Sequence, residues 1–147
     1  MVDLRIRQTA SSGVTVHPDC LSEYQNLKTK RSVRYVIYKV SDDKTQIVVD
    51  QAASTDYDEF IKALPERDCR YGVYDFEYEK PGEGKRNKIC FIFWSPDEAP
   101  IRSKMVYASS KDAIRRSLEG IGAEVQATDF SEVSYEAVLE KASRHTR

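Results

Sequence analysis

Two long strand-forming segments joined by a short turn constrain the fold of this chain more than any other feature. Residues 69–78 are rich in aromatic and β-branched side chains, and residues 88–94 are almost entirely apolar. The intervening residues 79–87 contain a proline, two glycines and a group of basic side chains. Strands favour the first composition and turns favour the second. The sequence therefore predicts a long β-hairpin whose tip is a charged turn.

The remaining segments predict further strands and four helices. Dense β-branched and aromatic residues mark strands, whereas apolar residues recurring every three or four positions mark helices. The predicted strands are 35–40, 46–50 and the edge strand 123–127; the predicted helices begin at Pro18, span 57–64 and 101–118, and close the chain after a cap at Ser131 or Ser134. This order predicts an α/β fold, a mixed α+β sandwich with a central mixed β-sheet flanked by helices on both faces.

Length and composition limit the class of protein. The 147 residues fit one compact domain, 40% hydrophobic and 32% charged, with a formal net charge of −1. That charge steers the whole chain toward neither nucleic acid nor acidic lipid. Three cysteines lie far apart, which predicts buried free thiols in a reducing compartment, the cytosol or the nucleus. We see no membrane-spanning run and no signal-peptide core.

The N-terminal residues 1–11 are predicted to be a flexible extension ahead of a single domain at 12–147. Apolar and charged residues alternate at 2–7, which leaves a short strand as the alternative, but the segment 9–13 of small and polar residues that follows favours mobility.

The sequence contains no motif that indicates an enzyme. The two histidines lie near the chain ends, and no cysteine–histidine group has the spacing of a zinc site. The Gly82–Lys85 segment lacks the spacing of a phosphate-binding loop and lies between two strands. We therefore predict no catalytic residue, no metal and no cofactor.

The segment 101–118 separates into two faces when it is wound as a helix. Its core side collects Val106, Tyr107, Ser110, Ala113, Ile114, Ser117 and Leu118, and its outward side collects Ile101, Met105, Ala108, Asp112, Arg115 and Arg116. Arg102 and Lys104 lie at the edges of the outward side. Apolar residues ringed by basic ones are typical of a protein-binding surface. The alternative is that Met105 packs under a neighbouring loop.

Two smaller charged groups remain. Residues 85–88 are basic and lie at the hairpin, and Glu140, Lys141 and Arg144 lie on the exposed side of the last helix. Taken alone, the hairpin group is equally compatible with a solvated turn, and the pattern of the helix group favours a solvated helix end.

Several segments together resemble the ADF/cofilin family. They are YGVYDFEY at 71–78, FWSPD at 93–97, RSKMVYASSKD at 102–112 and QATD at 126–129, with SGV at 12–14 in agreement. The resemblance runs in order from about Ser12 to the C-terminus. It implies the gelsolin-like fold of ADF-homology domains. It also implies binding to actin monomers and filaments, with twisting, severing and depolymerisation of ADP-actin filaments, by a monomeric protein of the cytoplasmic actin cytoskeleton.

The resemblance also implies two binding surfaces. The surface for both monomers and filaments would comprise Ser12, Gly13, Val14, Arg102, Lys104, Met105, Asp112, Arg115 and Arg116. The surface for filaments alone would comprise Arg86, Lys88, Glu140, Lys141 and Arg144. The same basic groups would bind phosphoinositide headgroups, and Ser12 would be the candidate for regulatory phosphorylation. In the family that serine lies almost at the initiator methionine, whereas here about ten residues precede it. The alternative function is a non-severing filament- or phosphoinositide-binding adaptor with the same fold.

Overall fold

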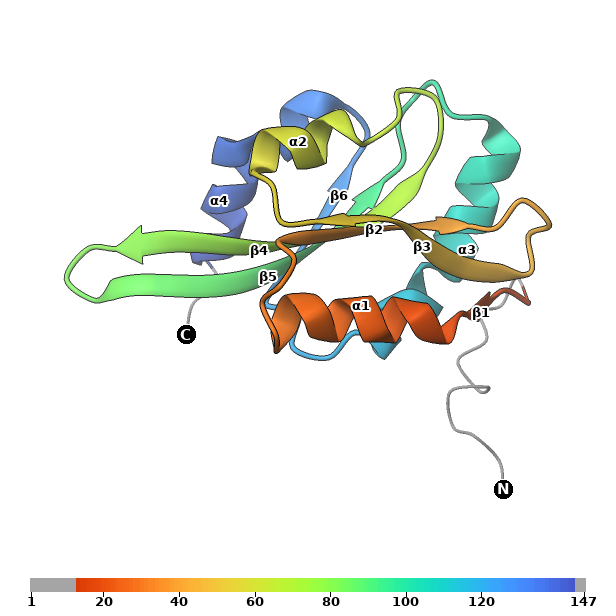
Figure 1. The fold of residues 1–147 in the computed structure, drawn as a ribbon. Coiled ribbons are helices and arrows are strands. Elements are labelled where there is room, and N and C mark those ends of the chain that lie inside the picture. Colours follow the sequence, from red (N-terminus) through yellow and green to blue (C-terminus); the bar gives the residue numbers. More distant parts are fainter. Residues whose placement is uncertain (1–12, 145–147) are drawn as a thin grey trace.

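The computed structural model describes residues 13–144, which form one mixed sheet with helices packed against it (Figure 1). The strands are β1 (Thr15–Val16), β2 (Tyr35–Val40), β3 (Gln46–Ala53), β4 (Arg70–Lys80), β5 (Gly84–Trp94) and β6 (Ala123–Ala127). The helices are α1 (Pro18–Lys28), α2 (Tyr57–Lys62), α3 (Ile101–Ser117) and α4 (Tyr135–Arg144), with the 3-10 turn η2 (Phe130–Val133) before α4.

The sheet has the order β1-β3-β2-β4-β5-β6. Its four central strands are antiparallel, and the two edge strands, β1 and β6, pair in parallel with their neighbours. The mixed sheet and the edge position of β6 are therefore confirmed. Strand β1 was not predicted, because two residues are too few to show an alternating pattern.

Alternation of side chains along the strands gives the sheet two apolar faces. On one face, buried residues of α1 and α3 such as Leu27 and Ile114 pack with Val73 and Phe91 of the sheet. On the other face, buried residues of α2 and α4 pack with Tyr74. Helices therefore cover both faces, as the sequence predicted, and the two core layers leave α3 and α4 on opposite sides of the sheet.

Local signals explain where the helices begin. His17 caps α1 by accepting the N–H of Asp19 on Nδ1 at 3.0 Å, and Pro18 occupies the first helical position, where no N–H is needed. Asp56 caps α2 in the same way. For α4 the cap is Ser134, whose Oγ accepts the N–H of Ala137 at 3.2 Å. Ser131, the other candidate, lies in η2 instead.

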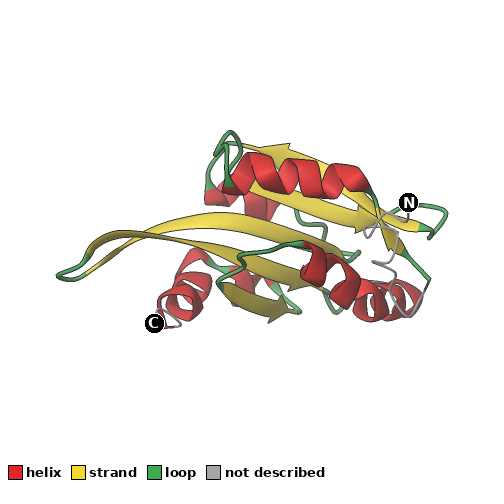
Figure 2. Ribbon diagram, turned by 90° about the horizontal axis from the view of Figure 1, so that it is seen from below, coloured by secondary structure: helices red, strands yellow, loops and turns green. Residues whose placement is uncertain are grey.

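The hairpin is longer than predicted. Residues 79–87 were expected to form the turn, but β4 continues to Lys80 and β5 begins at Gly84, so only 81–83 connect them. Gly82 and Gly84 supply the left-handed backbone that this tight turn needs, with φ of +79° and +80°. The extra strand residues pair across the hairpin, including Glu79 with Lys85. The two strands consequently project beyond the helices as a long arm (Figures 1 and 2).

The predicted flexible extension at 1–11 and the candidate Ser12 lie outside the described residues. Within residues 13–144, no helix is both long enough and apolar enough to cross a bilayer.

Candidate functional site

The outward side of α3 is an exposed apolar strip bordered by cations. Ile101 is 75% exposed and Met105 is 67% exposed, whereas Tyr107, Ala113 and Ile114 on the other side of the helix are buried. The predicted division of this helix into two faces is confirmed. The alternative, in which a loop covers Met105, is wrong.

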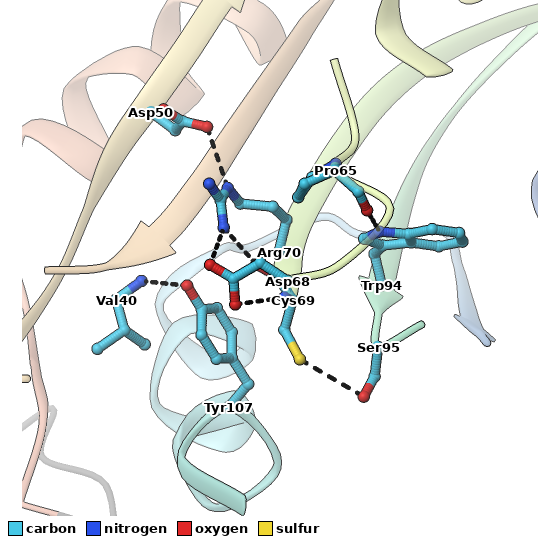
Figure 3. A network of polar contacts seen from close by, with 9 residues as sticks. All are labelled: Val40, Asp50, Pro65, Asp68, Cys69, Arg70, Trp94, Ser95 and Tyr107. Carbon is cyan, nitrogen blue, oxygen red and sulfur yellow. Dashed lines mark hydrogen bonds and ion pairs between the residues drawn. The ribbon is translucent and has the colours of Figure 1, made fainter. Parts of the chain in front are cut away.

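Buried hydrogen bonds fix α3 on the sheet through the side chain and the backbone of one residue, Tyr107. The N–H of Val40 donates to the Tyr107 hydroxyl at 2.9 Å, and the Tyr71 hydroxyl donates to the Tyr107 carbonyl at 2.6 Å. Beside this contact, Arg70 bridges Asp50 and Asp68, with 3.1 Å between the charged atoms of each pair (Figure 3). Because buried polar groups are costly to leave unpaired, these bonds hold the helix in one position. The outward strip is therefore presented on a rigid support.

The cations around the strip are held to different degrees. Arg102 and Arg116 are exposed, and so is Asp112. Lys104 donates its Nζ to the Asp97 carbonyl at 2.9 Å. Arg115 pairs with Glu124 of β6 at 2.9 Å, and Lys111 pairs with the second oxygen of the same carboxylate at 2.8 Å.

Glu124 is a positioning residue that the sequence did not reveal. Partial burial works against its charged form, but hydrogen bonds from Lys111 and Arg115 outweigh burial and lower the pKa of the Glu124 carboxyl. The pairing joins residues nine and thirteen positions apart that lie on different elements. Sequence patterns report neighbours on one element, so they gave no signal for this contact. It holds Arg115 in a fixed place beside the strip.

The first turn of α3 departs from the usual electrostatics of a helix start. It contains no acidic residue and has no side-chain cap, yet Arg102 and Lys104 lie there. The helix dipole disfavours cations at an N-terminus by a few tenths of a kcal/mol to about 1 kcal/mol each. A local cost without a folding benefit is expected where a binding surface needs the charge.

The start of the described chain lies next to α3. Gly13 is exposed with φ of +87°, whereas the Val14 side chain is only 1% exposed and belongs to the same core layer as Tyr107 and Ile114. Val14 therefore anchors this segment to the core, and Gly13 is the member of the pair that is open to solvent.

The second predicted group is brought together by the register of the hairpin. Residues paired across β4 and β5 point to the same face, and Phe76, which is paired with Lys88, belongs to the core layer under α4. Tyr78 and its partner Arg86 follow two residues along on that face. Arg86 and Lys88 therefore point to the side of the sheet that α4 covers.

Helix α4 completes this group. Glu140, Lys141 and Arg144 are exposed on it, and Arg144 pairs with Glu140 at 3.0 Å. Lys88 reaches the same helix, because its Nζ donates to the Ala142 carbonyl at 2.7 Å. Burial lowers the pKa of this lysine, so its ammonium is partly withdrawn from water. Lys88 thus joins the hairpin to α4, while Arg86 remains exposed.

The two groups lie at opposite ends of the molecule, with α3 at one end and the hairpin at the other (Figure 1). We name them by their residues. The α3 surface comprises Ile101, Arg102, Lys104, Met105, Asp112, Arg115 and Arg116, and the hairpin–α4 surface comprises Arg86, Lys88, Glu140, Lys141 and Arg144. Two separated surfaces suit a protein that contacts two partner molecules at once.

Neither the thiols nor the acidic side chains of the described residues form a reactive centre. Cys20, Cys69 and Cys90 are free and buried, and burial raises the pKa of Cys20 and Cys90 to about 12. Residues 13–144 contain no group of histidine, cysteine, aspartate and glutamate side chains able to hold a metal ion.

Comparisons with known proteins agree with this geometry. Residues 13–143 match the family model described as cofilin/tropomyosin-type actin-binding protein. The cofilin of Mycosarcoma maydis is 57% identical over 137 residues, covering 92% of this chain and 99% of that protein. The cofilin of Schizosaccharomyces pombe is 60% identical over 134 residues, covering 90% and 97%.

Solved structures show the same relationship. The crystal structure of Streptomyces griseoflavus cofilin is 49% identical with a TM-score of 0.86, covering 91% of this chain and all of that one. Plasmodium berghei actin depolymerization factor 2 is 31% identical with a TM-score of 0.81, covering 90% and 98%. The chain therefore belongs to the ADF/cofilin family of actin-binding proteins.

Proposed function

We propose that the α3 surface, together with Gly13, binds one actin subunit in both monomers and filaments, while the hairpin–α4 surface binds a neighbouring subunit only in filaments. Val14, which the resemblance included in the first surface, is buried and anchors this segment to the core. As an ADF/cofilin protein the chain binds actin and severs and depolymerises its filaments. The observation that supports the assignment of residues is the exposed apolar strip at Ile101 and Met105, bordered by cations on a rigid helix. Such a centre supplies affinity and its charged rim supplies orientation.

The two surfaces explain how binding changes the filament. A protein that contacts two subunits at once favours the relative orientation in which both contacts are made. It shifts the filament toward that orientation by its difference in affinity for the two states. Boundaries between twisted and bare segments then become sites of breakage, and loss of subunits becomes faster.

Paired variants test the assignment. Arg102→Ala combined with Lys104→Ala is expected to weaken binding to monomers and to ADP-actin filaments alike, measured by monomer titration and by co-sedimentation. Arg86→Ala is expected to weaken filament binding alone. Arg86 is preferable to Lys88 for this purpose, because Lys88 also holds the end of α4. Unchanged monomer and filament affinity in the α3 variant, or equal losses from both partners in Arg86→Ala, would contradict the two-surface assignment.

Severing has its own readout. Imaging of single filaments is expected to show shortening with the wild-type protein and binding without shortening with Arg86→Ala at a concentration that restores its occupancy. Filaments that the wild-type protein coats without shortening would instead identify the adaptor function.

Two forms of regulation follow from the charges on these surfaces. The exposed Arg102 and Arg116 suit the phosphates of phosphoinositide headgroups, which would compete with actin for the α3 surface. A phosphate on Ser12 would place nearly two negative charges beside Gly13, at the edge of the same interface. Ser12→Asp is expected to weaken monomer and filament binding together, and Ser11→Asp is the neighbouring control. We further propose that the protein acts as a monomer on the cytoplasmic actin cytoskeleton.

A further inference from the structure

A recess lies where the projecting hairpin passes α4. Two adjoining hollows of about 260 and 290 Å³ share Tyr78, Glu79 and Tyr135 in their walls. The larger one also reaches Leu139 and Ser143 of α4. Volumes of this size accommodate an anchoring side chain from another molecule, although they are small for a complete ligand.

The walls of the recess are mixed. Tyr78, Pro81, Tyr135 and Leu139 form the apolar part of the larger hollow, whereas Glu77, Glu79 and Lys85 also line the smaller one. The apolar part is built on the core. Tyr135 is 40% exposed, with its ring 5.4 Å from that of Phe76 and 5.7 Å from that of Tyr57. Leu139 is partly buried against the same core layer. The recess is therefore supported from beneath by packed aromatic rings, which is the setting in which interface anchors are found.

One polar group in the wall has no partner among the residues that the structure describes. The hydroxyl oxygen of Tyr78 is buried without a hydrogen bond, and the whole side chain is only 9% exposed. Buried hydroxyls are nearly always paired, and an unpaired one costs stability. Because this oxygen is sealed from solvent, a partner reaches it only when the wall opens slightly on binding, and a hydrogen bond made there would remove that cost.

Charge on the rim is divided between the two faces of the hairpin. By alternation along β4 and β5, Tyr78 shares its face with the cations Lys80, Arg86 and Lys88. The acidic Glu77 and Glu79 alternate to the opposite face, although both still border the smaller hollow and Glu79 borders the larger one as well. Glu83 in the turn lies 3.6 Å from Lys80 and 2.9 Å from Arg86. Exposed ion pairs of this kind contribute little to stability, so the carboxylates of a partner can replace Glu83.

The recess is open to an approaching chain. Strand β4 pairs with β2 only as far as Tyr74, so beyond that residue its outer edge has no neighbouring strand within the described part of the chain. The recess is also continuous with the hairpin–α4 surface, because Arg86 is the cross-strand partner of Tyr78. Any molecule that binds Arg86 lies directly beside it.

We infer that this recess receives an apolar side chain of the second actin subunit, carried on an acidic segment whose carboxylates pair with Lys80 and Arg86. This role rests on the proposed filament contact of the hairpin–α4 surface, and it adds Tyr78, Tyr135 and Leu139 to the residues that recognise the filament. The contact is thus an apolar anchor with a charged rim, as on α3, rather than a purely electrostatic one.

Filling the recess tests the inference. Ser143→Phe places a bulky ring in the wall and is expected to lower affinity for ADP-actin filaments about tenfold or more, with monomer affinity unchanged. The matched control is Ser22→Phe on α1, on the other side of the sheet. In both cases the serine hydroxyl that is lost donates to a carbonyl of its own helix, that of Glu140 or of Pro18. Co-sedimentation, monomer titration and thermal melting are measured for both variants.

A second variant keeps the test independent of packing. Tyr78→Phe removes only the unpaired hydroxyl, so it is expected to melt no lower than the wild type and to lose about three- to tenfold in filament affinity. Wild-type filament binding by both Ser143→Phe and Tyr78→Phe would overturn the inference, and so would equal losses from monomers and filaments. Arg86→Ala distinguishes a failure of the recess proposal from a failure of the whole filament surface. If it loses filament binding while the recess variants keep it, only the recess has failed, whereas retention by all three variants means that the filament surface itself is wrongly assigned.

Discussion

Truncation of the exposed methionine on α3 separates binding from stability more cleanly than any other change. Complete burial of a methionine side chain is worth about 1.5–3 kcal/mol. Because Met105 is 67% exposed, about two-thirds of that amount, roughly 1–2 kcal/mol, remains to be gained when actin covers it. Met105→Ala is therefore expected to weaken both monomer and filament binding about five- to thirtyfold. The melting temperature is expected to stay the same or rise slightly, since alanine is the better helix former.

The same helix supplies the opposite control. Ile114 is fully buried on the core side, so Ile114→Val is expected to cost about 0.5–1.5 kcal/mol of unfolding free energy while the folded protein keeps its affinity for actin. Titration of labelled monomers and co-sedimentation give the affinities, and urea unfolding gives the stabilities. A Met105→Ala variant that unfolds more easily but binds both forms of actin normally would refute the assignment of the α3 surface.

Three further predictions concern the contacts that hold the surfaces in place. Lys88→Met removes the hydrogen bond to the last turn of α4 and is expected to lower the unfolding free energy by about 1–2 kcal/mol in urea titrations. Glu124→Gln is expected to cost less than about 1 kcal/mol at neutral pH, since the pairs are partly solvated. Because the Glu124 pKa is lowered on folding, its contribution is present above the ordinary value of 4.5 and is lost as the pH falls through the lowered value, so unfolding curves of variant and wild type should converge in acid. Cys20 and Cys90, with pKa values raised to about 12, are expected to resist alkylation at pH 8 until the protein is unfolded, as followed by mass spectrometry.

Periodic patterns predicted most of the fold, because each pattern lies within one element. The spacing of Tyr107, Ala113 and Ile114 determines which side of α3 the core can accept, and it therefore also determines that Met105 faces outward. The β-branched and aromatic runs located β2, β4 and β5 to within a few residues. Periodicity cannot identify a binding partner, and the resemblance to the family supplied it, namely actin.

Contacts between distant elements were beyond sequence reasoning. The proline and glycines at 81–84 suggested a nine-residue turn, but cross-strand pairing extends the strands almost to the glycines. Val14 looked like a surface residue, and it is buried because β1 joins the edge of the sheet. Lys88 belonged to a basic run, yet its ammonium reaches α4. Each outcome depends on a neighbour more than twenty residues away or on a register that no local pattern encodes.

The register of the arm has a consequence for how this protein tolerates insertions. If one residue added near Gly82 shifted the pairing of β5 by one position, every β5 side chain in the arm would turn to the opposite face of the hairpin. Arg86 would then point to the face of the hairpin that carries Glu77 and Glu79, and Lys85 would point to the face that α4 covers. Two added residues would restore the orientation and only displace the charges along the arm. Insertions at the tip are therefore expected to follow a parity rule, with even lengths tolerated and odd lengths harmful to filament recognition.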